Sequence, residues 1–260
     1  MIDTHTHLNF PELAGNIEAV LGRSRQAGVS KWIVPATDLE TSLSSLSLAR
    51  EYSNIYACVG IHPCSAKEYS PEVKEKLIGL VEGKNLITSI GEVGLDCYHF
   101  EGLDEREIEV VKAQQIVVFS EMLNLANTHV LPLIIHSREA YFDTKKMLAQ
   151  YPQVRAVIHC FTGTKEESIG WLDQGCLLSL TGIITYKKNS ALREVIKQIP
   201  LTSIMLETDS PYLAPEGHRK EVCEPRFVRQ VAECVAEIHG ISIEEVDSVT
   251  TETAQSFFNL

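Results

Sequence analysis

The chain has 260 residues with 35 acidic and 23 basic side chains, which gives a formal net charge of −12. Its composition, 44% hydrophobic and 22% charged, is that of a folded globular domain and excludes disordered and collagen-like chains. An acidic chain is a poor non-specific binder of nucleic acid, because no excess of Lys and Arg displaces counterions. A phosphate substrate remains compatible with this charge if bound metal ions reverse the local field.

Cysteine usage and the N-terminal residues bear on the compartment. The seven cysteines include no CxxC pair, and the first residues lack the basic segment of a signal peptide. No apolar stretch approaches the roughly 18 residues of a membrane span. We therefore expect a cytoplasmic protein with free thiols and no membrane association, with a monomer as the default.

Short apolar runs alternate with longer amphipathic stretches along the whole chain. The runs have strand length and are often rich in Ile and Val; they are Met1–Leu8, Lys31–Pro35, Ile55–Ile61, Leu86–Leu95, Leu131–His136, Ala156–Cys160, Cys176–Ile184 and Ile204–Leu206. The stretches predict helices at Glu18–Gln26, Leu39–Glu51, Glu72–Val81, Glu105–Ala126, Ala140–Tyr151, Glu166–Asp173 and Ala191–Gln198, followed by Arg226–His239 and Ile243–Phe258.

Eight strand–helix units in about 250 residues predict a parallel sheet closed as a (β/α)8 TIM barrel. The C-terminal helical segments are additions to this barrel, and residues 1–260 form one predicted domain. A doubly wound open sheet is the competing fold, but no glycine-rich phosphate fingerprint follows the first strand. Within the long helical stretch, the spacing of Ile116, Phe119, Leu123 and Ala126 predicts a core face.

Ionisable residues end six of the eight predicted strands. Barrel enzymes place their chemistry at the carboxyl ends of the strands, so these residues are expected at one rim. His5 and His7 point to the same side of the first strand and are spaced to chelate one divalent ion. His136 and His159 are candidate nitrogen ligands of a second ion, and Glu92 is a carboxylate able to bridge two ions.

Carboxylates near these ligands have different expected roles. Asp209, at the end of the last strand, is a candidate metal ligand and a base for the attacking water. Glu207 and Asp3 lie deeper in their strands and are expected to orient ligands. Asp96 either orients a ligand or caps its loop, and the sequence leaves both open.

Three further residues at the rim are candidates for contact with a substrate anion. His62 and Arg138 follow strands, and Arg forks well onto phosphate oxygens. The alternative for Arg138 is a pair with a neighbouring carboxylate such as Glu139. Lys187, after the seventh strand, adds positive charge.

A series of motifs then resembles the TatD family of metal-dependent hydrolases. In chain order these are DTHTHL, GIHP, GEVGLD, LPLIIHSREA, HCFTG, TGIITYKK and LETDSPYLAP, and they extend from Ile2 to about Pro225. The resemblance implies a TIM barrel in the amidohydrolase-like superfamily and an activity such as that of the family's magnesium-dependent deoxyribonucleases.

When the family's ligand positions are matched to this sequence, the resemblance implies two metal sites that share Glu92. One ion would be held by His5, His7, Glu92 and Asp209, and the other by Glu92, His136 and His159. His62, Arg138 and Lys187 would face the scissile phosphate or its neighbours.

The chain departs from the family pattern in one segment. Members commonly carry a basic, Asn-containing segment before the Glu-Pro that here is Glu224-Pro225. In this chain Arg219 matches, but a basic residue and the Asn are missing. The departure concerns the hold on a nucleic-acid strand and not the metal site.

The expected function is metal-dependent hydrolysis. The family resemblance implies a 3′-to-5′ exodeoxyribonuclease that acts on DNA ends or on another phosphodiester substrate. It would use two divalent ions, Mg, Mn or Zn. One alternative is an amidohydrolase-like hydrolase of small amides, lactones or aminoacyl esters; the absence of a strand-end lysine at the position of Glu92 counts modestly against it. A third possibility is a non-catalytic binding protein that retains a metal site.

Overall fold

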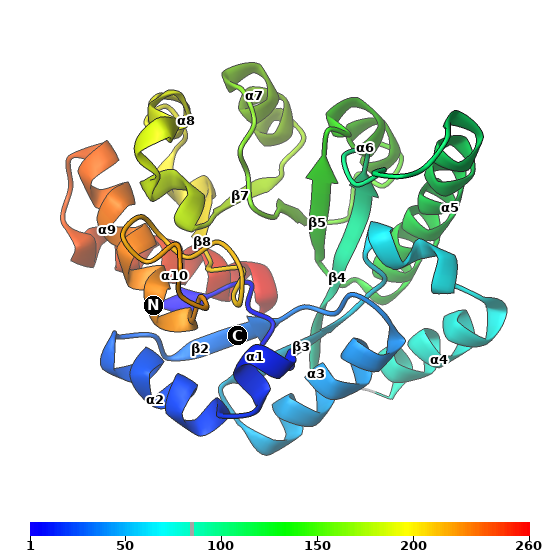
Figure 1. The fold of residues 1–260 in the computed structure, drawn as a ribbon, viewed down its shortest axis with the longest axis horizontal. Coiled ribbons are helices and arrows are strands. Elements are labelled where there is room, and N and C mark those ends of the chain that lie inside the picture. Colours follow the sequence, from blue (N-terminus) through cyan, green and yellow to red (C-terminus); the bar gives the residue numbers. More distant parts are fainter. Residues whose placement is uncertain (84–85) are drawn as a thin grey trace. The chain divides into compact units, whose positions relative to one another are not determined.

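The computed structural model describes residues 1–83 and 86–260, and its elements are shown in Figure 1. Eight short strands follow one another in the order β1 to β8 within the sheet. They are β1 (Ile2–Asp3), β2 (Lys31–Val34), β3 (Ile55–Val59), β4 (Ile87–Asp96), β5 (Leu133–Arg138), β6 (Ala156–Ile158), β7 (Leu177–Leu180) and β8 (Ile204–Leu206).

Helices separate the strands and continue after the last one. They are α1 (Pro11–Ala14), α2 (Ile17–Gln26), α3 (Leu39–Glu51), α4 (Pro71–Glu82), α5 (Glu105–His129), α6 (Tyr141–Leu148), α7 (Lys165–Asp173), α8 (Ser190–Ile196), α9 (Val228–His239) and α10 (Ile243–Phe258). This alternation in sequential strand order is that of a (β/α)8 barrel, so the predicted fold class is confirmed, including the helical additions α9 and α10.

The chain divides into two compact units. Unit 1 comprises Met1–Val34, Tyr52–Tyr56 and His159–Leu260, and unit 2 comprises Pro35–Glu51 and Ala57–Ile158. In unit 1, β1 pairs in parallel with β2, and β7 with β8. In unit 2, β4 pairs in parallel with both β3 and β5, and β5 pairs with β6.

Local sequence signals account for where several helices begin. Helix α5 starts with a capping box, in which the Asp104 side chain accepts the Glu107 N–H and the Glu107 side chain accepts the Asp104 N–H. Thr164 and Glu167 form the same device at α7. Predicted and observed ends differ mostly by one to three residues, because the end of a helix depends on its cap. Two strand predictions differ more. The run Met1–Leu8 ends as a strand at Asp3, and the run Cys176–Ile184 ends as a strand at Leu180 and continues as the 3₁₀ turn Gly182–Thr185.

The core face of α5 corrects one prediction. Phe119, Leu123 and Ala126 are buried as expected, but Ile116 is 44% exposed and its neighbour Gln115 is buried instead. The amide of Gln115 makes this possible, because it donates to the Asp96 carbonyl (3.1 Å) and accepts the Asp96 N–H (3.0 Å). A buried amide that is hydrogen-bonded on both sides costs little, so the buried face of the helix starts one residue earlier than apolar spacing indicates.

Candidate metal centre

In unit 1, the segment after β1 is held against the segment after β8 by backbone hydrogen bonds. Thr4 N–H donates to the Leu206 carbonyl (3.0 Å), Asp209 N–H to the His5 carbonyl (2.9 Å) and His7 N–H to the Ser210 carbonyl (2.8 Å). These bonds extend the pairing beyond the short strands. They bring the two predicted histidines and the predicted base together.

A cluster of three imidazoles and two carboxylates results, consisting of His5, His7, His159, Glu207 and Asp209 (the unit-1 cluster). The Asp209 Oδ1 atom lies 3.7 Å from His5 Nε2, 3.5 Å from His7 Nε2 and 3.8 Å from His159 Nε2. The rings of His5 and His159 stack with their centroids 3.6 Å apart. His5, His159 and Asp209 thus offer ligand atoms close enough together to hold a divalent ion, and His7 lies next to Asp209 at their side.

Glu207 lies on the other side of these rings. Its carboxylate is buried, with Oε1 2.8 Å from His159 Nδ1 and Oε2 4.0 Å from His5 Nδ1. The Cys160 N–H also donates to Glu207 Oε1 (2.7 Å). A carboxylate on the Nδ1 side of His159 orients this ring and turns its Nε2 atom toward Asp209.

Burial and charge set the protonation state of Asp209. Burial alone would raise the pKa of this carboxyl group, but the neighbouring imidazoles of His159, His7 and His5 outweigh it and the pKa is lowered. Asp209 is therefore ionised at neutral pH, the form in which a carboxylate binds a metal ion or accepts a proton.

A short loop with unusual backbone geometry presents Asp209. The residue adopts a left-handed conformation, with φ of 59°. The preceding Thr208 is anchored to buried Asp3, whose carboxylate accepts the Thr208 N–H (3.0 Å) and hydroxyl (2.6 Å). Because β8 ends at Leu206, strand alternation does not operate at Asp209, and this anchor sets its direction instead.

Unit 2 carries a second cluster, formed by His62, Glu92, Asp96 and His136 (the unit-2 cluster). The His136 ring lies between two carboxylates, with Nδ1 2.8 Å from Glu92 Oε1 and Nε2 3.0 Å from Asp96 Oδ2. His62 Nε2 lies 3.4 Å from Glu92 Oε1, while His62 Nδ1 accepts the Cys64 N–H (3.1 Å). The proton of a neutral His62 is thus on Nε2, facing Glu92.

Asp96 performs both of the roles that the sequence left open. Its Oδ2 orients His136, and its Oδ1 caps the following loop by accepting the N–H groups of Tyr98 (2.8 Å) and His99 (2.9 Å). Burial raises the pKa of this carboxyl, but hydrogen bonds from His136, His99 and Tyr98 outweigh burial and lower it well below the usual range. Asp96 is consequently a permanent anion beside the His136 ring.

Comparison with known proteins identifies the family of this chain. The family model described as TatD related DNase matches residues 2–259. The chain belongs to the TatD family.

Three relatives of full length illustrate the family. YabD of Bacillus subtilis, named an uncharacterized metal-dependent hydrolase, is 33% identical, and the alignment covers 100% of this chain and 99% of YabD. The protein of Erwinia amylovora named 3′-5′ ssDNA/RNA exonuclease TatD is 32% identical, with 100% of both chains covered. The crystal structure of YjjV from Escherichia coli, a TatD homologue, has a TM-score of 0.92 at 32% identity and covers 100% of this chain and 98% of YjjV.

The donor atoms fit what a TatD-family metal-dependent hydrolase requires. Imidazole nitrogens and carboxylate oxygens suit Zn²⁺ and Mn²⁺, and each cluster pairs a ring with a buried carboxylate that orients it. The predicted residues His5, His7, His159 and Asp209 meet in unit 1, and His62, Glu92 and His136 meet in unit 2. The division of these residues between two ions stays a prediction.

The predicted anion contacts lie in different environments. The Arg138 guanidinium carbon is 4.0 Å from the centre of the Tyr98 ring, and not beside Glu139 as the alternative supposed. Arg219 lies over the Tyr186 ring at 4.5 Å. Lys187 lines a hollow of about 410 Å³ together with Arg193 of α8. Contact of these residues with a substrate stays a prediction.

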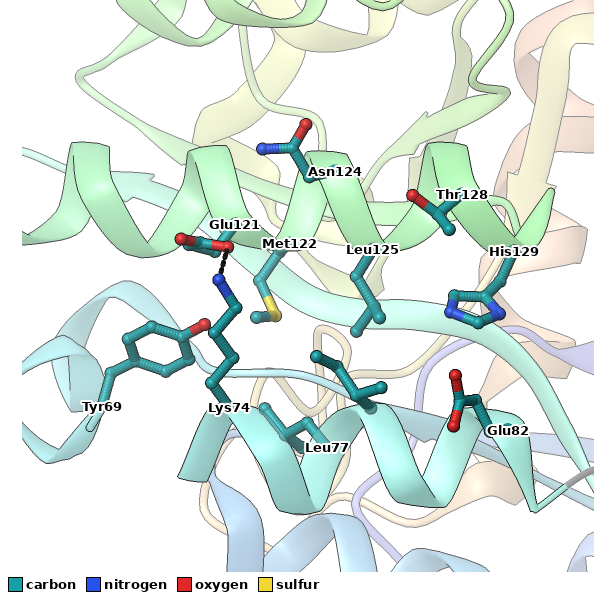
Figure 2. A pocket seen from close by; sticks show the side chains of 11 residues that line it. Tyr69, Lys74, Leu77, Glu82, Glu121, Met122, Asn124, Leu125, Thr128 and His129 are labelled. Carbon is teal, nitrogen blue, oxygen red and sulfur yellow. Dashed lines mark ion pairs between the residues drawn. The ribbon is translucent and has the colours of Figure 1, made fainter. Parts of the chain in front are cut away.

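A separate cavity lies away from the strand ends, between α4 and α5 of unit 2 (Figure 2). It has a volume of about 280 Å³ and is lined by apolar side chains such as Leu77 and Met122, with the Lys74–Glu121 ion pair (2.7 Å) at its edge. None of the predicted site residues lines this cavity. This apolar cavity is therefore separate from the candidate metal ligands.

Sequence reasoning missed Gln115 and the anchoring of Thr208. The available signal for Gln115 was a polar residue next to the apolar face of α5, but a polar residue at that position is ordinarily exposed. The hydrogen bond from Thr208 to Asp3 joins residues 205 positions apart, so no local pattern indicates it.

Gly94 supports the unit-2 cluster through its lack of a side chain. It pairs with His136 in the β4–β5 register and has φ of 142°. A Cβ atom on Gly94 would collide with the His136 carbonyl oxygen. We predict that Gly94→Ala displaces His136, lowers the metal content of the purified protein and reduces turnover by about tenfold or more. Gly22→Ala is the control, because a Cβ there meets no atom within 4 Å; full metal content in Gly94→Ala would contradict the prediction.

Proposed function

We propose that this TatD-family protein is a 3′-to-5′ exonuclease that hydrolyses phosphodiester bonds at single-stranded DNA ends. The observation that carries the proposal is the convergence of ring nitrogens on the ionised Asp209 carboxylate in unit 1. The name of the Erwinia amylovora relative, a 3′-5′ ssDNA/RNA exonuclease, supports the choice of substrate.

The metal content proposed is two divalent ions, Zn, Mn or Mg, in a binuclear centre. His5, His7, Glu92 and Asp209 are assigned to one ion, and Glu92, His136 and His159 to the other, as the family motifs imply. When bound, such ions activate water and neutralise the charge that develops on a phosphoryl group. The donor chemistry of both clusters supports this assignment.

The protein side chains supply the remaining functions. Asp209 accepts the proton of the attacking water, since it is ionised at neutral pH. Glu207 and Asp96 hold His159 and His136 in fixed orientations. His62, Arg138, Lys187 and Arg219 contact the phosphates of the strand, which offsets the charge of −12 on the chain where the substrate binds.

The proposal includes a cytoplasmic monomer. All seven cysteines are free thiols, which agrees with a reducing compartment. No helix in the described part of the chain has the length and apolar character needed to span a membrane.

A substrate panel with the metal-loaded protein tests the function. We expect single strands labelled at the 5′ end to shorten progressively from the 3′ end, and duplexes to react more slowly. Small amides, lactones and aminoacyl esters should not react. Hydrolysis confined to those small substrates would replace the nuclease proposal with an amidohydrolase-like activity. Bound metal without any product would indicate a binding protein.

A further inference from the structure

Tyr98 and Arg138 form an exposed aromatic–cation pair in unit 2. The Tyr98 side chain is 49% exposed, although large aromatic rings are usually buried. The guanidinium carbon of Arg138 lies 4.0 Å from the ring centroid, well within the range of a cation–π contact. The His99 ring meets Tyr98 edge-on, with the centroids 5.0 Å apart. The pair therefore presents a flat π surface and a positive charge to solvent at the same place.

The backbone holds this pair in position. Asp96 and Arg138 are partners in the β4–β5 register, and the Cys97 N–H donates to the Arg138 carbonyl (2.9 Å). The Tyr98 N–H donates to the buried Asp96 carboxylate (2.8 Å). Because these bonds are made on folding, little backbone entropy remains to be lost when a ligand binds to the ring.

The pair is also directly linked to the unit-2 cluster. The carboxylate that accepts the Tyr98 N–H is the one that orients His136, through Asp96 Oδ2 at 3.0 Å from His136 Nε2. Because Tyr98 follows Asp96 by two residues and binds the same carboxylate as His136, a substrate whose reacting phosphate lay at this cluster would extend its neighbouring group toward Tyr98. In a single-stranded nucleic acid that neighbouring group is a nucleoside, whose base is a flat π system.

We infer that Tyr98 and Arg138 form a nucleobase subsite, an inference that rests on the proposed nuclease function. A base of the single-stranded end stacks on the exposed part of the Tyr98 ring, and the Arg138 guanidinium pairs with an adjacent phosphate. Stacking on an aromatic side chain is tolerant of sequence because every base has a π face, so the subsite selects for unpaired bases and not for a particular base. It also supplies binding that does not depend on net charge, which an acidic chain needs.

The test compares two substrates, a short single-stranded oligothymidylate and the same strand with abasic residues at its 3′-terminal two positions. The measured quantity is the ratio of their kcat/KM values with metal-loaded protein. Wild type should prefer the strand that carries bases by about tenfold, the value expected for one stacked base. Tyr98→Ala should bring the ratio close to one, and Tyr98→Phe should retain it, because phenylalanine keeps the ring.

Tyr151→Ala is the matched control. Tyr151 follows α6 and precedes β6, so it lies at the opposite end of the strands from the clusters, and its hydroxyl donates to Asn124 (2.9 Å). This variant should keep the wild-type ratio.

Three outcomes are distinguishable. A ratio that falls in Tyr98→Ala and not in Tyr98→Phe supports the subsite. A ratio that is the same in wild type and Tyr98→Ala overturns it, because a purely structural pair affects both substrates alike. If wild type cleaves neither strand, the nuclease function fails and the subsite inference fails with it. Circular dichroism of each variant separates loss of the ratio from loss of the fold.

Discussion

Asp209→Asn should lower kcat for single-stranded DNA by about a thousandfold or more, since general-base catalysis alone contributes 10²–10⁴-fold. Asparagine has nearly the same shape as aspartate but carries no charge and accepts no proton at neutral pH. In the wild type, the imidazoles of His159, His7 and His5 lower the pKa of this partly buried carboxyl and keep it ionised. The loss should appear in kcat with a smaller change in KM, because the residue acts on the reacting water.

The same substitution on the surface of unit 1 provides the control. Asp173 is exposed at the end of α7, and Asp173→Asn should retain wild-type kinetics. Metal analysis of Asp209→Asn then separates two roles. Unchanged metal content with lost turnover assigns Asp209 to the proton transfer, and reduced metal content assigns it to ligation as well. A decrease of only a few fold in kcat would remove Asp209 from both roles.

Much of this site was predictable because the strands of a (β/α)8 barrel all have their carboxyl ends on the same side. Residues that follow the predicted strands are therefore expected to gather there. His5, Glu92, His136 and Asp209 are polar residues that interrupt or end apolar runs, and such residues need a partner or a function. The sequence therefore indicated which residues gather, without any knowledge of distances.

The orientation of the rings was not predictable from the sequence. In unit 1, His159 turns Nδ1 toward Glu207 and Nε2 toward Asp209, whereas in unit 2 His136 turns Nδ1 toward Glu92 and Nε2 toward Asp96. Which nitrogen is available to an ion depends on where the orienting carboxylate lies, and that is set by packing.

Contacts over long sequence separations were also outside the reach of local patterns. Burial of Gln115 in place of Ile116 depends on the Asp96 backbone, 19 residues away, and the direction of Asp209 depends on Asp3 through Thr208. The Arg138 side chain had two plausible anionic partners in the sequence, yet the structure places it on the Tyr98 ring. The spacing of residues along the chain indicates none of these contacts.

Removal of divalent ions should abolish hydrolysis completely. Both clusters bring carboxylate and imidazole groups close together, and a divalent ion held by them would supply the positive charge that stabilises a reacting phosphodiester. Dialysis against a chelator should therefore leave turnover at background, while circular dichroism shows that the fold is kept.

Adding back single metals should restore the activity, with Zn²⁺ and Mn²⁺ effective at lower concentrations than Mg²⁺, because imidazole-rich donor sets bind the first two more strongly.

Protons compete with the ions for the ring nitrogens, so the concentration of Zn²⁺ needed for half-maximal recovery should rise as the pH falls below about 6.5, the ordinary pKa of histidine. His7→Ala should require more metal at every pH, whereas His129→Ala, which alters a histidine at the end of α5, should behave as wild type. Activity that survives complete removal of metal would contradict the hydrolytic mechanism, and recovery by Mg²⁺ alone would show that the carboxylates, and not the imidazoles, dominate the binding of the ions.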